Sequence, residues 1–174
     1  FYLKDSIDNT PNNYCLAEIG VLKGGTSKYI AKVAPDRQLY IYDTFNGLPK
    51  CFISPIDGDW SEKVFSDTNF DEISRYLSDC KNIIIQEGEV PFTLNNIKDN
   101  NFSFVFIDCV LYYSIYSSLL FFSERINNNS NIIVDDYGRK ECPGVKIAVE
   151  KFIKEEKIFS LDILEDYMVL IKKK

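Results

Sequence analysis

The stretch Ile132-Ile133-Val134-Asp135-Asp136-Tyr137-Gly138 is an apolar run that stops at two adjacent carboxylates. An apolar run of this kind predicts a buried strand. The carboxylate pair then lies where open α/β sheets bind ligands, outside the carboxyl ends of the strands. Two like charges 4 Å apart repel by roughly 1 kcal/mol in water and by more in a cleft, so a cation between them would be favourable. The stretch therefore predicts an α/β fold and suggests a site for a divalent metal.

A second apolar run, residues 104–107, ends in the same way at Asp108. Carboxylate oxygens are the ligands that hard divalent cations prefer. Asp108, Asp135 and Asp136 are therefore the candidate metal ligands. The alternative is that these carboxylates cap the helices that follow the two strands.

The composition describes one domain of ordinary size. The chain has 174 residues, 45% of them hydrophobic, and a net charge of −6. This charge argues against a nucleic-acid partner, and no apolar run approaches the ~20 residues of a membrane helix. No signal peptide is visible, and the five cysteines lack metal-ligand spacing, so we expect a reduced, cytoplasmic protein. The sequence does not begin with methionine, and we expect a fragment that lacks an N-terminal lid.

The sequence contains no histidine. This absence excludes Ser-His-Asp hydrolases, Cys-His proteases, histidine-ligated zinc sites and histidine general bases. The chemistry must therefore use carboxylates, lysine, tyrosine, cysteine or a cofactor. We expect a small-molecule partner, and a homo-oligomer is left open.

Apolar runs alternate with helical periodicity, which is typical of βα units around a mostly parallel sheet. Two final strands joined by a short link at Glu165-Asp166 suit an antiparallel hairpin. Asn127-Asn128-Asn129 is predicted to be a tight connection between a helix and the fifth strand. Strands are predicted near residues 14–19, 38–43, 82–86, 102–108, 130–135, 158–163 and 167–172, and helices near 25–34, 69–78, 90–97, 112–126 and 143–156.

Residues 46–68 interrupt this alternation with two prolines and the single tryptophan, Trp60. A loop of this length in a compact domain often serves as a lid or a binding segment. We predict a lid on the substrate side of the site, and the alternative is a surface excursion with a short helix.

The segment Glu18-Ile19-Gly20-Val21-Leu22-Lys23-Gly24-Gly25-Thr26-Ser27 follows the first predicted strand and opens the first long helix. Glycines there let the backbone approach a ligand at the helix N-terminus. The pattern acid-x-Gly-x-x-x-Gly resembles the S-adenosylmethionine loop of class I methyltransferases. A turn followed by a helix cap is the alternative.

The next two strands end in further acidic residues. Asp43 ends the second strand about 20 residues after the loop, where an acid accepts hydrogen bonds from ribose hydroxyls. A nicotinamide dinucleotide would need the same acid, so a nicotinamide-dependent oxidoreductase is a further hypothesis. The third strand ends at Gln86-Glu87-Gly88-Glu89. Adenine recognition is expected there, and negative charge in the first turn of the next helix is the alternative.

Five motifs resemble one family, the macrocin O-methyltransferase (TylF-type) family, over roughly residues 15–155. The most specific are Asp43-Thr44-Phe45-Asn46-Gly47-Leu48-Pro49 and Asp135-Asp136-Tyr137-Gly138. The others are the glycine loop, residues 107–112 and residues 143–149.

The resemblance implies a Rossmann-like methyltransferase fold with a seven-stranded, mostly parallel sheet, a C-terminal antiparallel hairpin and helices on both faces. It also implies one domain over residues 1–174, S-adenosylmethionine and Mg²⁺ as cofactors, and a sugar or similar small polyol as acceptor. The metal ligands would be Asp108, Asp135 and Asp136. The cofactor-binding residues would be Glu18, Gly20, Gly24, Ser27, Asp43, Thr44, Glu87, Gly88 and Asp108.

One position departs from the family pattern Asp-x-Asp-Leu-Tyr, because Val110 replaces the second acid. That acid is a natural candidate for the general base. Lys140, just beyond the acid pair, is the candidate base in this chain, and a lysine base needs a pKa lowered by burial or by a nearby cation. The alternative function is a degenerate protein that binds S-adenosylmethionine without methyl transfer.

Overall fold

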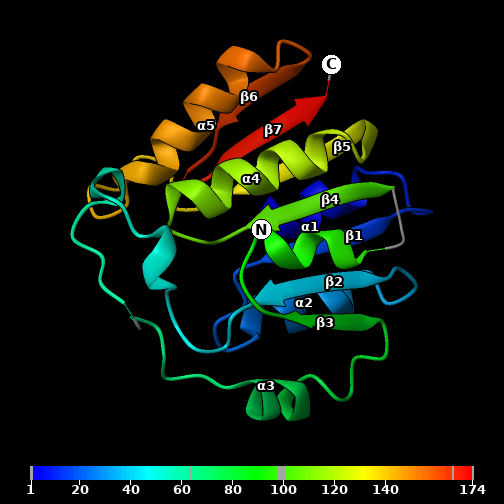
Figure 1. The fold of residues 1–174 in the computed structure, drawn as a ribbon. Coiled ribbons are helices and arrows are strands. Elements are labelled where there is room, and N and C mark those ends of the chain that lie inside the picture. Colours follow the sequence, from blue (N-terminus) through cyan, green and yellow to red (C-terminus); the bar gives the residue numbers. More distant parts are fainter. Residues whose placement is uncertain (1, 63, 98–100, 166, 174) are drawn as a thin grey trace.

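The computed structural model describes residues 2–62, 64–97, 101–165 and 167–173 (Figure 1). Its centre is a 7-stranded sheet in the order β3-β2-β1-β4-β5-β7-β6. The first five strands pair in parallel, and β7 runs antiparallel to both β5 and β6. The strands are β1 Cys15–Ile19, β2 Leu39–Asp43, β3 Ile83–Glu87, β4 Phe102–Ile107, β5 Ile126–Val134, β6 Phe159–Ile163 and β7 Val169–Lys173.

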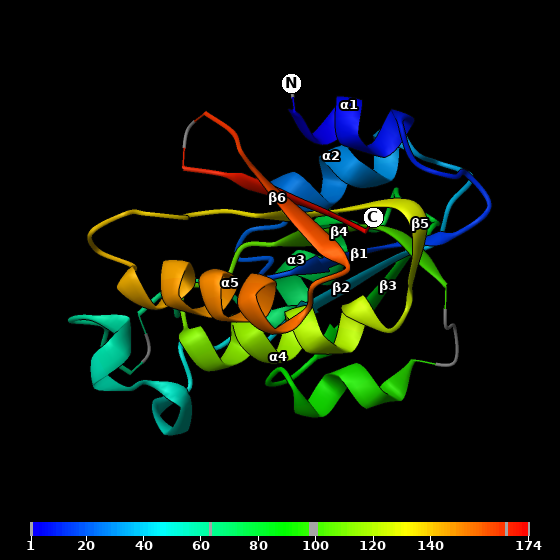
Figure 2. The same cartoon turned by 90° about the horizontal axis from the view of Figure 1, so that it is seen from above.

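Helices cover both faces of the sheet (Figure 2). The helices α1 Tyr2–Asp8, α2 Gly25–Val33 and α3 Phe70–Tyr76 belong to one layer, and α4 Tyr112–Ser123 and α5 Pro143–Glu155 pack together on the other face. Short 3₁₀ helices are η1 Lys50–Phe52, η2 Pro55–Asp57 and η3 Phe92–Asn96. This arrangement confirms the predicted fold class, the mostly parallel sheet and the C-terminal antiparallel pair.

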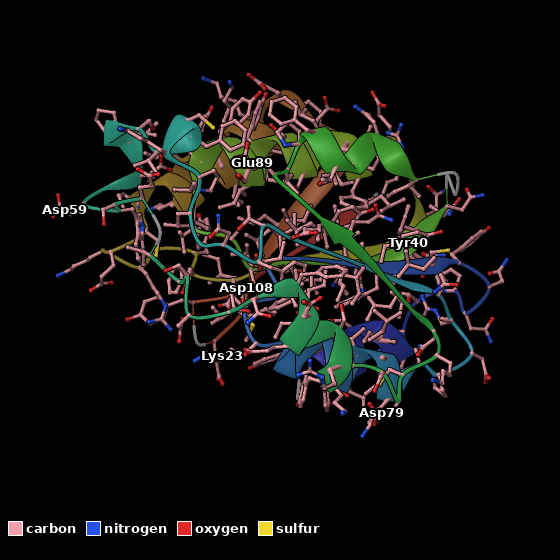
Figure 3. All side chains as sticks on the ribbon, turned by 60° about the horizontal axis from the view of Figure 1, so that its bottom comes forward. Lys23, Tyr40, Asp59, Asp79, Glu89 and Asp108 are labelled. Atoms are coloured by element: carbon pink, nitrogen blue, oxygen red, sulfur yellow. The ribbon has the colours of Figure 1, made fainter. Side chains whose placement is uncertain are left out.

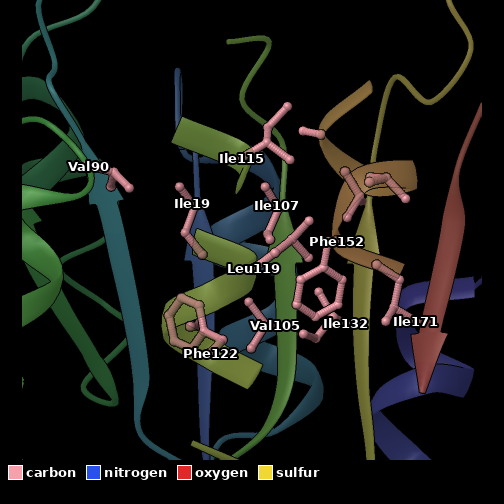
Figure 4. Close-up of a cluster of buried hydrophobic side chains, with 14 of the residues drawn as sticks. Ile19, Val90, Val105, Ile107, Ile115, Leu119, Phe122, Ile132, Phe152 and Ile171 are labelled. Carbon is pink, nitrogen blue, oxygen red and sulfur yellow. The ribbon is translucent and has the colours of Figure 1, made fainter. Parts of the chain in front are cut away.

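Two apolar layers hold the helices to the sheet. In β5, Ile132 faces the α4/α5 layer (Figure 4). Val134 faces the same layer, whereas Ile133 faces the layer of α1, α2 and α3. Because both faces are covered, the central strands are mostly apolar on both faces instead of alternating between apolar and polar residues. All six residues of β4 are buried accordingly.

The register brings the carboxyl ends of the parallel strands to one edge. Ile19 lies beside both Tyr42 and Ile107, and Ile107 lies beside Val134. Residues that follow these strands therefore meet at the same edge, which is where an open α/β sheet binds ligands.

Two local predictions were wrong, and one helix was missed. The segment predicted as a helix near 90–97 contains only the 3₁₀ helix η3. The asparagines 127–129 lie inside β5 rather than in a connection, because Ile126 pairs with Phe102 and the extra residues form an irregularity before Asn131 pairs with Phe104. The helix α1 was not predicted, since its seven residues bury only Ser6 and Ile7. The link at Glu165-Asp166 lies partly outside the described residues.

Among the described residues, no helix combines the length and the apolar character that crossing a membrane would require.

Candidate active site

A cavity of about 270 Å³ opens at the edge where the parallel strands end. Its lining comes from the turns after β1, β2, β3, β4 and β5 and from the long segment after β2. The lining residues are Ile19, Gly20, Leu22, Tyr42, Asp43, Thr44, Gly47, Leu48, Pro49, Phe65, Gly88, Glu89, Val90, Asp108, Cys109, Val110, Leu111, Ser114 and Asp136. In Figure 3, Asp108 lies near the middle of the view, and Glu89 and Asp59 lie farther toward the rim.

Gly20 directly follows β1 within the glycine loop (residues 18–27), and the structure permits no side chain there. Its φ is +90°, and a Cβ atom would lie 2.1 Å from the carbonyl oxygen of Asp108. The backbones that follow β1 and β4 therefore meet without an intervening side chain. The result is a cradle in which backbone groups can approach a ligand closely.

Asp43, at the end of β2, holds this loop in place. Its Oδ2 accepts hydrogen bonds from the backbone N–H groups of Val21 (2.7 Å) and Leu22 (2.9 Å). Its Oδ1 accepts from the N–H of Phe45 at 2.8 Å. Carboxylate oxygens offer about four lone-pair sites. The Thr44 hydroxyl lies 3.5 Å from Oδ1 but makes its short hydrogen bond, 2.7 Å, to the carbonyl oxygen of Gly47, so one further donor, such as a ribose hydroxyl, can be accommodated at the cavity surface.

Glu18 and Ser27 interact with each other beneath the loop. Glu18 is 1% exposed and accepts a hydrogen bond from the hydroxyl of Ser27, which is fully buried. Burial raises the pKa of the Glu18 carboxyl well above its usual value, while the Ser27 hydrogen bond opposes this shift. Neither residue lines the cavity, so the structure places both as supports beneath the loop.

Asp108 faces the cavity at the end of β4. Its side chain is open to the cavity yet surrounded by protein. This enclosure, with repulsion from Asp135 and Asp136, raises the pKa of Asp108 to about 7, and Arg139 partly offsets the shift. Val110 lies on the same cavity wall and is buried, so an apolar side chain occupies the position where the family has an acid.

The carboxylates after β5 already have partners. Asp136 forms an ion pair with Arg139, whose Nε lies 2.5 Å from Oδ1. Asp135 Oδ1 accepts a hydrogen bond from the N–H of Asp136 at 2.7 Å. Within the described ranges, no group of three or more histidine, cysteine, aspartate or glutamate side chains is placed to hold a metal ion. As arranged here, the three acids do not form a metal cage, and the Arg139 guanidinium supplies the positive charge beside Asp136.

The structure thus brings together about half of the predicted site residues. Those that line the cavity are Gly20, Asp43, Thr44, Gly88, Asp108 and Asp136. Those outside its lining are Glu18, Gly24, Ser27, Glu87, Asp135 and Lys140. Lys140 is exposed on the turn after β5, so the geometry gives no support for it as the general base.

Several lining residues were not among the predicted metal, cofactor and base residues, although residues 46–68 were predicted as a lid on the substrate side. Leu48, Pro49 and Phe65 come from the long segment after β2, whose length and prolines were the signal that marked it as functional. Val90 and Ser114 could not be recognised as cavity residues from the sequence. An apolar residue, or a serine at a helix start, is common in any α/β domain.

The sheet order, with β7 antiparallel beside β5, is that of the methyltransferase fold. More narrowly, the chain belongs to the macrocin-O-methyltransferase (TylF) family, which matches residues 5–167. The predicted family is confirmed, and the chain is an O-methyltransferase of this S-adenosylmethionine-dependent group. No curated protein matches the sequence.

Solved structures share this fold at low sequence identity. The O-methyltransferase NovP superposes with a TM-score of 0.81 at 19% identity, covering 99% of this chain and 78% of NovP. The calicheamicin methyltransferase CalS11 has a TM-score of 0.78 at 18% identity, with 98% and 76% coverage. A caffeoyl-CoA O-methyltransferase candidate from Staphylococcus aureus has a TM-score of 0.68 at 17% identity, with 99% and 81% coverage. These identities establish the common fold.

Proposed function

We propose that this protein transfers the methyl group of S-adenosylmethionine to a hydroxyl of a sugar or similar small polyol. The observation that carries the proposal is the cavity at the strand ends, where Gly20, Asp43 and Asp108 meet. The family supports O-methylation. CalS11, which shares the fold, is described as a TDP-rhamnose 3'-O-methyltransferase, and this supports a sugar acceptor.

When bound, S-adenosylmethionine supplies an activated methyl group on a sulfonium, so the protein must chiefly align the acceptor and accommodate the loss of its proton. Gly20 leaves room for the ligand against the backbone, and Asp43 fixes the loop that encloses it. Leu48, Pro49 and Phe65 form the apolar side of the cavity and exclude water from an acceptor. Asp108 presents a carboxylate to the same space.

Magnesium assistance is the finer part of the proposal. Its support is the donor chemistry, three carboxylates at two adjacent strand ends. The ion pair between Asp136 and Arg139 would have to open before Asp136 could bind a metal. Isothermal titration of the protein with MgCl₂, in the presence of S-adenosylhomocysteine, tests this part. Absence of binding would show that methyl transfer proceeds without Mg²⁺.

A methyl-transfer assay tests the main proposal. The protein is incubated with S-adenosylmethionine labelled on its methyl group and with TDP-rhamnose, and label on the sugar is measured by mass spectrometry. We expect transfer that depends on both compounds. Tight binding of S-adenosylhomocysteine without transfer to any of a panel of sugars and polyols would instead favour a binding protein, an interpretation that Val110 and the Asp136–Arg139 pair favour.

A reduced cytoplasmic setting and a homo-oligomer remain predictions. The five cysteines are free, as a reducing compartment would require.

A further inference from the structure

We propose that Asp57 is a positioning residue that holds one wall of the cavity against the starts of α4 and α5. These helices follow β4 and β5, the strands that Asp108 and Asp135 directly follow. The wall segment is defined as residues 46–62 and 64–68. It supplies Gly47, Leu48, Pro49 and Phe65 to the cavity lining. This role of Asp57 is separate from the proposed function, because Asp57 holds the wall segment in place in the protein without ligands.

Asp57 is a fully buried carboxylate with hydrogen bonds at both oxygens. Its Oδ2 accepts from the backbone N–H (3.0 Å) and the hydroxyl (2.8 Å) of Ser54, which closes the turn η2. Its Oδ1 accepts from the backbone N–H of Tyr112 at 2.5 Å. A carboxylate that is 0% exposed would be costly to bury without such partners.

The Tyr112 hydrogen bond joins the wall segment to the first turn of α4. The first N–H groups of a helix have no partner within the helix, and the residue that precedes α4, Leu111, offers no side-chain cap. Asp57, 55 positions earlier in the chain, supplies the missing acceptor. Its negative charge also lies at the helix end that favours anions. The same contact places the wall beside Asp108 and Leu111, which precede α4 and line the cavity.

The start of α5 is shaped around the same carboxylate. A Cβ atom at Gly144 would lie 2.3 Å from Asp57 Oδ1 and 3.2 Å from the backbone nitrogen of Tyr112. A Cβ atom at Gly58 would lie 3.2 Å from Cδ of Pro143. The close approach explains why the sequence has glycine directly after Pro143. Figure 1 shows the cyan wall segment beside the starts of α4 and α5.

Trp60 reports on this latch. It is the only tryptophan in the chain, lies three residues after Asp57, and packs against Phe65 with ring centroids 5.5 Å apart. Phe65 in turn lines the cavity. If the hydrogen bond between Asp57 and Tyr112 is lost, Trp60 should become accessible to solvent while the sheet and its helices stay folded.

The experiment compares wild type with Asp57→Ala, Asp57→Asn, Gly144→Ala and the double variant Asp57→Ala/Gly144→Ala. Acrylamide quenching of Trp60 reports the wall, and far-UV circular dichroism in urea reports the whole fold. We expect quenching to rise about twofold or more in Asp57→Ala and Gly144→Ala, with the Trp60 transition preceding the circular dichroism transition. Asp57→Asn keeps one acceptor and should fall between wild type and Asp57→Ala.

The two single variants should not be additive, because they break one contact. The double variant is therefore expected to match the more strongly affected single variant. Two variants are the matched controls and should show the same Trp60 quenching as wild type. Asp59→Ala changes an exposed acid two residues from Asp57 (Figure 3). Gly25→Ala adds a Cβ atom that meets nothing within 4 Å.

Three results would overturn the proposal. Unchanged Trp60 quenching in Asp57→Ala and Gly144→Ala is the first. Coincident transitions that merely shift to lower urea are the second, since they would show a role in global stability alone. Additive effects in the double variant are the third. If Asp57→Ala fails to fold, Asp57→Asn and Gly144→Ala decide the same question.

Discussion

At the scale of single residues, Glu18 shows how a buried acid couples stability to pH. Burial raises its pKa in the folded protein, so the folded state binds this proton more tightly than the unfolded state. Its favourable contribution is complete below the usual glutamate pKa and is lost as the pH rises through the raised folded value. The ligand-free protein should therefore lose stability as this carboxyl ionises.

Glu18→Gln removes this ionisation and keeps an acceptor for the Ser27 hydroxyl. We expect the variant to be more stable than wild type at pH 8, on the order of 1–3 kcal/mol, with the difference shrinking toward pH 4. Urea unfolding across this pH range measures it. Glu87→Gln, at an exposed acid, should change stability by less than about 0.5 kcal/mol at any pH. The prediction would be contradicted if the free energy of unfolding differed between Glu18→Gln and wild type by the same amount at every pH.

Arg139 competes with any divalent cation for Asp136. An exposed ion pair is worth about 1 kcal/mol or less, so Arg139→Gln should tighten Mg²⁺ binding by up to roughly fivefold, in calorimetric titrations at constant ionic strength. Lys140→Gln removes an exposed positive charge from the next position and serves as the control. Equal Mg²⁺ affinity in Arg139→Gln and Lys140→Gln would show that general charge, and not the ion pair, sets the affinity.

At the scale of elements, the turn after β1 depends on Gly20. Gly20→Ala would place a methyl group 2.1 Å from the Asp108 carbonyl oxygen at a φ of +90°. We expect a loss of about 2–4 kcal/mol in the free energy of unfolding, measured in urea, because the backbones of two neighbouring strands must separate. Gly25→Ala, where a Cβ atom meets nothing within 4 Å, should be neutral or stabilising by up to about 1 kcal/mol. Similar losses in both variants would refute the close-approach argument.

The parallel strands could be predicted from sequence because they are buried on both faces. The run Phe104–Ile107 is apolar throughout and ends at a charged residue, so its identity and its carboxyl end are both visible. The predicted connection at Asn127–Asn129 was wrong, because polar residues in a strand irregularity have the composition of a loop. Helix α1 escaped detection since its stability comes from packing against distant elements rather than from its own pattern.

For the site, the strand-end acids were visible, but their partners were not. Asp43 and Asp108 follow apolar runs, and the sequence pattern alone is enough to place them at the sheet edge. The Asp136–Arg139 pair and the Asp57–Tyr112 contact depend on turn geometry and on a separation of 55 residues. Side-chain contacts of that kind follow from the folded arrangement and have no periodic signal in the sequence.

At the scale of the whole molecule, a ligand in the cavity would contact the ends of β1, β2 and β4 and the wall segment at once. Gly20, Asp43, Asp108 and Phe65, which represent these parts, all line the cavity. A ligand that binds only the folded state raises the free energy of unfolding by about 2.7 kcal/mol at one hundred times its dissociation constant. For a domain of this size that corresponds to a rise in Tm of roughly 5–10 °C.

We expect S-adenosylhomocysteine to raise Tm by this amount and NAD to leave it unchanged, in thermal unfolding followed by circular dichroism. The comparison separates the two cofactor classes, because both would place a ribose at Asp43 while only the methyltransferase product carries an amino-acid group toward the glycine loop. Asp43→Ala removes the acceptor that fixes Val21 and Leu22 and should abolish most of the shift. Stabilisation by NAD would instead favour the nicotinamide class of cofactor. An equal shift in Asp43→Ala would place the ligand elsewhere than the cavity at the strand ends.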